Sequence, residues 1–303
     1  MADVTQGYED STYLLGDAGA LRARGEADGY LFFAGRIPTE PLVELRRQII
    51  SIIDKHGLLH ADSTDDEPRA DAEKVSAEPF FAGCTEPIYT DVQRLELFHR
   101  IAHHPTILDV FETLFAGPVL PHPRNIARVL LPGKNARPTP PHQDYIHIQG
   151  AVQTWTAWFP LTDVPRELGG LSVMPASHRK GIIAVGGAEG AGGLETQLCP
   201  GENTWIEHDF KLGDVLIFPS TTVHKGLPNQ LGDRIRLSCD FRYQDAADDI
   251  EQQSLDPHRQ VLTWDEIYAG WERDDLKYYW QKHDLHMSLW DESIRWQKER
   301  ICN

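Results

Sequence analysis

The middle of the chain, residues 124–245, alternates short runs of β-branched and aromatic residues with residues that form turns. Gly, Pro, Asn and Asp stand between these runs, and each of them favours turns through its backbone preferences. Several short strands at this spacing are typical of an all-β sandwich or barrel. The clearest runs are NIARVLL, AVQTWTAWFPL, LSVMP, DVLIFP and RIRLSCDFRY.

The segments on either side of this region have helical patterns. The apolar spacing of residues 39–57 predicts a helix. Residues 60–90 are polar and acidic, and a loop of this length is often a lid or a binding segment. A Gly-rich insertion, 185–203, is expected to be mobile. We expect one domain, 1–303, made of a helical N-terminal part with its lid loop (19–120), a β core (121–245) and a helical tail (246–303).

Composition narrows the class of partner. The formal net charge is −17, and a surface this acidic repels phosphate backbones and anionic lipids, so neither nucleic acid nor a membrane is expected as a partner. No apolar stretch approaches the ~18 residues that span a bilayer. The N-terminus has neither a basic start nor an apolar run, so we expect no signal peptide. The cysteines are widely spaced and form no CxxC pair, which favours a reduced, cytoplasmic protein; they are Cys84, Cys199, Cys239 and Cys302.

The candidate chemistry lies in two short motifs of the β region. His142 and Asp144 are two residues apart, and in an extended chain such residues point to the same side. His224 lies just beyond the apolar strand DVLIFP. Two imidazoles and one carboxylate make the facial triad of non-haem Fe(II) oxygenases, which leaves coordination positions open. A 2-oxo acid can occupy two of these positions and O₂ the third.

A chelating 2-oxo acid also needs a cation at its far carboxylate. Arginine suits this role because its planar guanidinium pairs with a carboxylate through two hydrogen bonds. Arg234 stands ten residues after His224 at the start of the next strand, and we expect it to bind the far carboxylate of the 2-oxo acid. Arg236 is the alternative for this role. Alternatively, Arg234 is an ordinary strand residue whose side chain faces solvent and binds no ligand.

The chain resembles the phytanoyl-CoA dioxygenase family of Fe(II)/2-oxoglutarate-dependent oxygenases. The blocks that carry the resemblance cover about 25–245 and are ADGYLFFAGRIPTEPLVELRRQI, HQD, WTAWFPLTDVPRELGGLSVMPASHRKG and HKGLPNQLGDRIRLS. The resemblance implies a mainly β fold with a double-stranded β-helix (a jelly roll, as in cupins) and flanking helices. It further implies that iron binds to the side chains of His142, Asp144 and His224. It implies that Arg234 holds the distal carboxylate of 2-oxoglutarate, and that Trp155 lines the cosubstrate pocket.

One residue departs from the family pattern. Members often carry Ser or Thr two residues after the second histidine, where its hydroxyl assists the arginine, but this chain has Gly226 there. The second hydrogen-bond donor to the 2-oxoglutarate carboxylate must therefore come from another residue or be absent. Arg128, on the strand before the HxD motif, is one candidate, although it could equally be an exposed strand residue.

The resemblance implies an oxidoreductase that uses Fe(II), 2-oxoglutarate and O₂ to hydroxylate an unactivated C–H bond of a small molecule, with release of succinate and CO₂. Asp144 favours hydroxylation over halogenation, whereas desaturation, cyclisation and epimerisation stay open. A metal-dependent cupin-like hydrolase or isomerase, and a non-catalytic jelly roll, are the alternatives from other classes. Basic residues near the motifs, among them Arg124 and Arg242, could recognise an anionic substrate, but we favour a solvated rim. Substrate identity and oligomeric state are not predicted.

Overall fold

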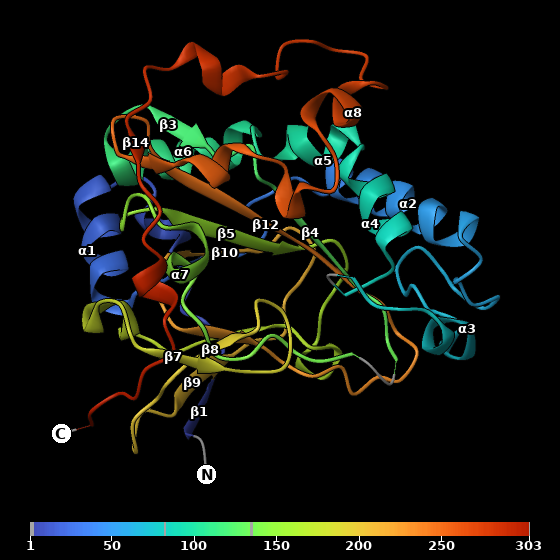
Figure 1. Ribbon diagram of the computed structural model, residues 1–303, viewed down its shortest axis with the longest axis horizontal. Helices are drawn as coiled ribbons and strands as arrows, with labels where there is room; N and C mark the ends of the chain where they lie inside the picture. The colour runs from blue at the N-terminus through green and yellow to red at the C-terminus, as the bar shows by residue number, and fades with distance from the viewer. Residues whose placement is uncertain (1–2, 82, 134–135, 303) are drawn as a thin grey trace.

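Two β-sheets face each other in the computed structural model, which describes residues 3–81, 83–133 and 136–302. The larger sheet has six strands and the smaller has four (Figure 1). The larger sheet runs, in spatial order, β2 (Leu31–Phe33), β10 (Val215–Pro219), β5 (Trp155–Pro160), β12 (Arg236–Asp245) and β3 (Val119–Pro121), and β4 (Ile126–Leu130) also pairs with β12. The smaller runs β1 (Asp3–Gln6), β9 (Thr204–Glu207), β6 (Leu171–Val173) and β11 (His224–Gly226). The fold is thus mainly β with a jelly-roll core, as predicted.

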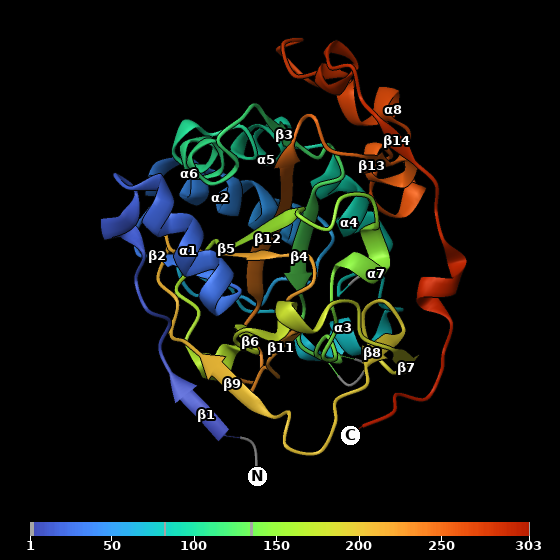
Figure 2. The same ribbon diagram turned by 90° about the vertical axis from the view of Figure 1, so that its left-hand side faces the viewer.

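Helices cover the outer face of the larger sheet, opposite the smaller sheet (Figures 1 and 2). The predicted helix at 39–57 is observed as α2 (Thr39–Lys55), with Leu42, Leu45, Ile49 and Ile53 buried at helical spacing. The other helices of this layer are α1 (Ala18–Asp28), α4 (Glu86–Gln93), α5 (Glu96–Ile101) and α6 (Pro105–Phe115). The short elements elsewhere are α3 (Ala72–Ala77), α7 (Tyr145–Ile148), α8 (Trp264–Tyr268), β7 (Val185–Gly187), β8 (Leu194–Thr196), β13 (Ile250–Glu251) and β14 (Met287–Ser288).

The larger sheet separates two apolar cores. One core lies between this sheet and the helices, and Phe159 and Phe241 are fully buried in it. The other lies between the two sheets and includes Trp158, Val173 and Phe218. Alternation along a strand sends neighbouring side chains to opposite faces, so each long strand contributes to both cores.

The two predicted loops carry some regular structure. The segment 60–90 contains the short helix α3, and the Gly-rich segment 185–203 forms the hairpin of β7 and β8. No described helix is long and apolar enough to cross a membrane. The cellular location stays a prediction.

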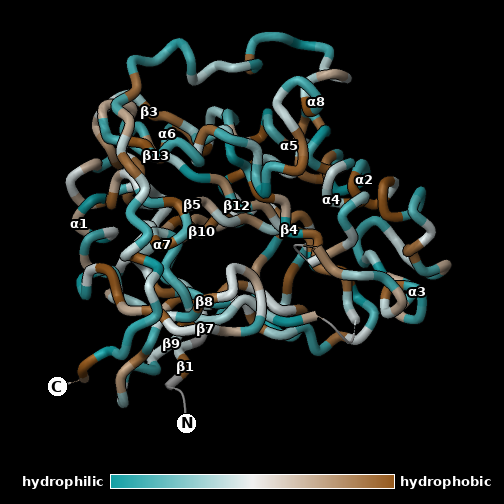
Figure 3. Tube along the Cα trace, in the orientation of Figure 1, coloured by the Kyte–Doolittle hydropathy of each residue, from teal (hydrophilic) through white to brown (hydrophobic). Residues whose placement is uncertain are grey.

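The tail is less helical than predicted. Its described residues beyond β12 form one short α-helix, α8, a few single turns of 3-10 helix, and a cluster of aromatic side chains in which Trp264, Trp271 and Trp280 are buried. Gly270 follows α8 closely, and glycine is a poor helix former. The segment after α8 is mostly hydrophilic (Figure 3), so a longer helix there would have no continuous apolar stripe to bury.

The last part of the tail, residues 287–302, runs back along the β core, and we call it the C-terminal strap. Its strand β14 pairs in parallel with β13, and its far end forms a disulfide between Cys302 and Cys199. The prediction that every cysteine is reduced is therefore wrong for these two. Their separation of 103 residues gives no sign in the sequence that they meet. Cys84 and Cys239 are free and buried.

Candidate metal centre and substrate cavity

His142, Asp144 and His224 come together between the two sheets. His142 and His224 form an isolated antiparallel bridge, in which each backbone N–H donates to the other residue's carbonyl, at 2.9 and 3.0 Å. Asp144 lies directly before α7, and one donor atom from each of the three side chains lies within 4.8 Å of the others. The prediction that these side chains meet is confirmed.

Hydrogen bonds orient both imidazoles toward the carboxylate. Nδ1 of His142 lies 2.8 Å from the carbonyl oxygen of Pro140, and Nδ1 of His224 lies 3.0 Å from that of Thr222. A carbonyl only accepts, so each Nδ1 is the donor, and in the neutral form of such an imidazole Nε2 has the lone pair that binds a metal ion. These Nε2 atoms lie 3.7 and 3.8 Å from Oδ1 of Asp144. Nitrogen and oxygen donors held in this way fit the ligand set of non-haem Fe(II).

Asp144 is held as a carboxylate by its neighbours. Thr156 Oγ1 donates to Oδ2 at 2.6 Å, and Nη2 of Arg242 donates to Oδ1 at 3.2 Å. Burial alone would raise the pKa of Asp144, but the Arg242 guanidinium and the two imidazoles outweigh it and hold this pKa well below its usual range. The site therefore offers one negative charge for a cation.

His224 is neutral at ordinary pH. Burial, followed by the neighbouring His142, lowers the pKa of His224 to about 3. A neutral imidazole is the form that binds a metal ion. Protons therefore do not compete for this ligand at neutral pH.

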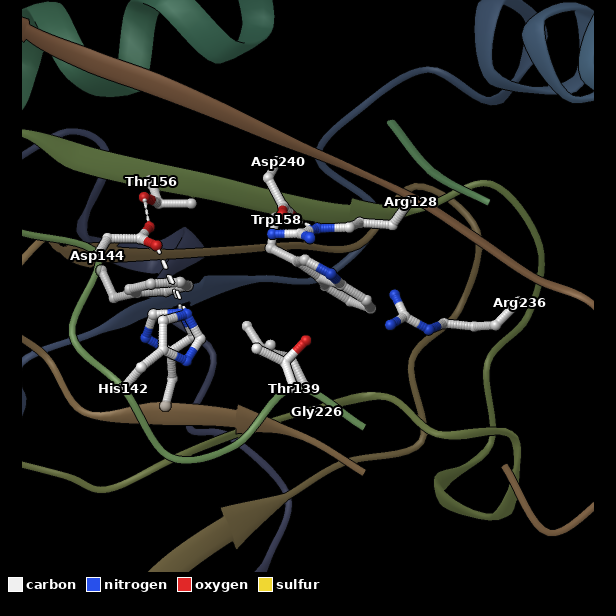
Figure 4. Close-up of a pocket in the computed structure, with 12 residues that line it drawn as sticks. Arg128, Thr139, His142, Asp144, Thr156, Trp158, Gly226, Arg236 and Asp240 are labelled. Atoms are coloured by element: carbon white, nitrogen blue, oxygen red, sulfur yellow. Dashed lines mark hydrogen bonds and ion pairs between the residues drawn. The ribbon is translucent and has the colours of Figure 1, made fainter. Parts of the chain in front are cut away.

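An inner cavity opens beside the three side chains. Figure 4 shows Arg236 pointing from its strand toward Trp158, with Thr139 and Gly226 on the opposite wall. Arg236 is 5% exposed, its Nη1 donates to Ser238 Oγ at 2.5 Å, and its Nε has no hydrogen-bond partner among the described residues. Burial lowers the pKa of Arg236 to about 10, so the guanidinium is still charged at neutral pH. The inner cavity thus holds a buried cation with unused hydrogen-bonding capacity.

Arg234 does not reach this cavity, which corrects the prediction. Its Nη1 pairs with Glu67 Oε1 at 3.0 Å, and its backbone forms an isolated bridge with Arg69. Strand β12 begins only at Arg236, so the alternation that would bring residue 234 to the same face does not extend that far. The alternative named above, Arg236, is the residue that lines the cavity.

Trp155 also lies outside the cavity. Its side chain packs in the core on the helical face of the sheet, close against Gly25, where an added Cβ would stand 2.9 Å from its ring. Alternation along β5 places Thr156 and Trp158 on the cavity side instead. The prediction named the wrong face of the strand, because all six residues of β5 are buried and apolar periodicity carries no signal there.

Arg128 does line the inner cavity, but its Nε pairs with Oδ2 of Asp240 at 2.6 Å. Sequence reasoning did not identify Thr139, Thr156 or Trp158 as site residues. Thr156 and Trp158 alternate with Trp155 and could have been found by testing the opposite face of the strand. Thr139 lies in an irregular segment, where no periodicity indicates a direction.

A larger outer cavity of about 850 Å³ adjoins the inner one. The two share lining residues, among them His142, Asp144 and Arg236. Its walls come from strand β4, from Phe80 in the predicted lid segment, from Gly190–Gly193 in the hairpin insertion, and from Trp290 and Arg295 in the C-terminal strap. A small organic molecule fits a cavity of this size.

Comparison with known proteins agrees with this site. A family model described as phytanoyl-CoA dioxygenase matches residues 25–237. The 1-deoxypentalenic acid 11-beta-hydroxylases of Streptomyces arenae and Streptomyces exfoliatus are each 27% identical to this chain, over 270 and 272 residues, which is 85% of this chain and 92% of each relative.

Solved structures share the fold. The epimerase SnoN in complex with Fe3+, alpha ketoglutarate and nogalamycin RO superposes with a TM-score of 0.54 at 21% identity, over 78% of this chain and 86% of that one. EctD from S. alaskensis, with 2-oxoglutarate and 5-hydroxyectoine, gives 0.51 at 16% identity, over 81% of each chain. The chain belongs to the phytanoyl-CoA dioxygenase family and is an iron(II)- and 2-oxoglutarate-dependent oxygenase.

Proposed function

We propose that this enzyme hydroxylates a C–H bond of a small organic molecule, with iron held by His142, Asp144 and His224. Iron(II) bound there would let O₂ oxidise the substrate while 2-oxoglutarate loses CO₂ to give succinate. The observation that carries the proposal is the buried His–Asp–His cluster, whose donor atoms lie beside two adjoining cavities. The inner cavity, about 20 Å³, and the outer cavity, about 850 Å³, share lining residues and together offer room for cosubstrate and substrate.

Arg236 is the residue we assign to the distal carboxylate of 2-oxoglutarate. It is buried and charged, and it lines the same small cavity as the three metal ligands. The guanidinium carbon lies 5.9 Å from the ring centroid of Trp158, and Nη1 is held by its hydrogen bond to Ser238 Oγ. A guanidinium fixed in this way can pair with a carboxylate at low conformational cost.

Thr139 is the residue we assign as the second donor. A Cβ at Gly226 would stand 3.2 Å from the backbone nitrogen of Thr139, and the Gly226 N–H donates to the Thr139 carbonyl oxygen at 3.0 Å. The absence of a side chain at 226 thus lets the segment around Thr139 approach β11. The hydroxyl that family members often carry at that position is then supplied from the neighbouring segment.

Asp144 supports hydroxylation as the outcome. A carboxylate at this position fills a site that halide would otherwise need. The relatives named as hydroxylases keep 27% identity over most of the chain, and they make 1-deoxypentalenic acid the first compound to test as a substrate.

The test measures succinate released from 2-oxoglutarate under air, with Fe(II), ascorbate and 1-deoxypentalenic acid as the candidate substrate. We expect wild-type protein to release succinate and to give a visible charge-transfer band when Fe(II) and 2-oxoglutarate are added without O₂. The His224→Ala variant should lose both signals. The exposed His283 offers a matched control, and His283→Ala should keep both. Wild-type protein that gives neither band nor succinate would contradict the proposed function.

A further inference from the structure

The outer cavity carries a charge opposite to that of the whole molecule. The chain has a formal net charge of −17, yet seven arginines line this cavity, and Asp144 supplies the one carboxylate among its described lining residues. An acidic protein that gathers arginines around one cavity has a local potential suited to an anion. Of the basic residues expected to form a solvated rim, Arg242 is buried and Arg124 is half-buried in this wall, whereas Arg137 is exposed; Arg259, also of this cavity, is exposed too.

Most of these arginines have identified partners. Arg128 pairs with Asp240 and Arg242 with Asp144, while Arg137 pairs with Glu189. Arg236 is assigned above to the cosubstrate, and Arg295 stands over the ring of Trp290.

Arg124 and Arg259 remain without a carboxylate partner among the described residues. Arg124 Nη1 donates to the backbone carbonyl of Gln253 at 3.2 Å, and the guanidinium of Arg259 lies 4.5 Å from the ring centroid of Phe81. Neither contact neutralises the positive charge. These two side chains therefore have charge to offer a ligand.

Arg124 and Arg259 line the same cavity as His258, and both act electrostatically on its ring. The ring of His258 is hydrogen-bonded to the hydroxyl of Tyr89. Burial, together with Arg124, Arg128, Arg242 and Arg259, holds the pKa of His258 well below its usual range. This histidine is therefore neutral, and it adds no positive charge to a region that already contains several arginine side chains.

The backbone at Arg259 has an unusual conformation. Arg259 has φ +69° and the next residue, Gln260, has φ +52°. Two successive residues with side chains in the left-handed region are uncommon, because glycine adopts it far more easily. Backbone of this kind persists at ligand sites where a side chain has to be placed in one direction.

Strand alternation gives the site an apolar neighbour. Ile126, Arg128 and Leu130 alternate along β4 and line the outer cavity as one face of the strand, and Arg124, in the segment just before β4, lines it as well. Ile126 pairs with Asp240 on β12, and the His122 N–H donates to the Arg242 carbonyl, so Arg124 lies in the short irregular segment between these two pairings. Arg236 lies six residues, about 20 Å, from Arg242 along β12. The pair is thus separated from the cosubstrate arginine and adjoins an apolar wall.

We propose that Arg124 and Arg259 form the binding site for a substrate carboxylate, so that the substrate is an amphipathic carboxylic acid. This inference rests on the proposed function for its chemistry, since it assumes that the outer cavity holds the molecule to be oxidised. The apolar body of the acid would lie on Ile126 and Leu130, and its carboxylate would bridge the two guanidinium groups. One carboxylate can accept hydrogen bonds from both, and pairing of this kind is among the strongest polar contacts.

The test compares the binding of acids with that of their methyl esters. Calorimetry on the protein in the presence of Fe(II) and 2-oxoglutarate, without O₂, would use dodecanoic acid, abietic acid and 1-deoxypentalenic acid. We expect each acid that binds to do so about 10-fold to 100-fold more tightly than its ester, because the ester loses a charge-assisted contact. Arg124→Gln and Arg259→Gln should remove most of that preference, and Arg124→Lys should keep part of it.

The control is Arg179→Gln, since Arg179 is exposed, its guanidinium donates to the carbonyl oxygen of Glu26, and it is not among the described residues that line the cavity. It should bind every probe as wild type does, and melting temperatures would show that all variants fold. Equal affinity for acid and ester, no binding of any acid, or a preference that survives both glutamine variants would overturn the inference. Tighter binding of dodecyl phosphate than of dodecanoic acid would overturn the carboxylate assignment. Acid preference in a protein that never forms succinate would refute only the proposed function.

Discussion

Replacing Arg236 by Gln tests the cosubstrate site most directly. Arg236 is 5% exposed, so its charge is removed from water and its pairing with a carboxylate would be only weakly screened. Truncating one partner of a buried charge pair typically costs 2–5 kcal/mol. Taking about 3 kcal/mol, we expect Arg236→Gln to raise the dissociation constant of 2-oxoglutarate about 100-fold.

Arg234→Gln is the matched control, two residues away. The ion-pair partner of Arg234, Glu67, is 57% exposed, and pairs with exposed partners contribute at most about 1 kcal/mol to stability. Because Arg234 does not line the cavity, its replacement should leave the affinity for 2-oxoglutarate within about twofold of wild type, since only contacts to the ligand change its affinity directly.

The assay is an anaerobic titration of the Fe(II)-loaded protein with 2-oxoglutarate, followed by visible absorption, and repeated as succinate release under air. Melting temperatures of both variants would show whether the fold is intact. A large effect of Arg234→Gln with little effect of Arg236→Gln would refute the assignment and with it the strand register on which it depends.

Three further predictions concern the second donor, the strap and a constrained turn. Thr139→Val should raise the 2-oxoglutarate concentration needed for half-maximal succinate release by about 10-fold, because one hydrogen bond to a charged group is lost, whereas Thr139→Ser should not. Burial opposes the shift, but hydrogen bonds led by that from Arg300 lower the pKa of Glu202 to about 2. A carboxyl group whose pKa is lowered by folding stabilises the folded state above its ordinary pKa, and this stabilisation is lost as the group is protonated. The difference in melting temperature between wild type and Glu202→Gln should therefore shrink as the pH falls from 4.5 to 2. A difference that grows over this range would contradict the prediction. Gly169 has φ +94° and a Cβ there would stand 2.6 Å from a backbone oxygen, so Gly169→Ala should lower the free energy of unfolding in urea by about 1–3 kcal/mol, unlike Gly270→Ala, where no atom lies within 4 Å.

The metal ligands could be predicted from the sequence because each depends on local geometry. In an extended chain a two-residue spacing places His142 and Asp144 on one side, His224 lies five residues beyond the end of β10, and the family resemblance joins the three into one ligand set. Short strands and turns that recur throughout the core predict a sandwich or barrel, and the resemblance to the family narrows this prediction to a jelly roll.

The remaining site residues depend on which face of a strand meets the cavity. Strand β5 is buried on both faces, so its sequence does not distinguish Trp155 from Trp158. The start of β12 decides between Arg234 and Arg236, and strand ends are set by pairing with distant segments. The contact of Thr139 with Gly226 and the disulfide of the strap likewise join segments far apart in the chain.

Strand β12 has a consequence for how the enzyme would fail on heating. One face of this strand carries Arg236, Asp240 and Arg242 toward the cavities, and the other buries Phe241 and Tyr243 beneath the helices. It is hydrogen-bonded to three other strands, so it cannot detach without opening the larger sheet. The strand that carries the site residues is therefore also one that can separate only when the whole sheet unfolds. Heat inactivation should coincide with the main calorimetric transition, and loosening of the strap alone should alter which molecules enter without abolishing cosubstrate turnover.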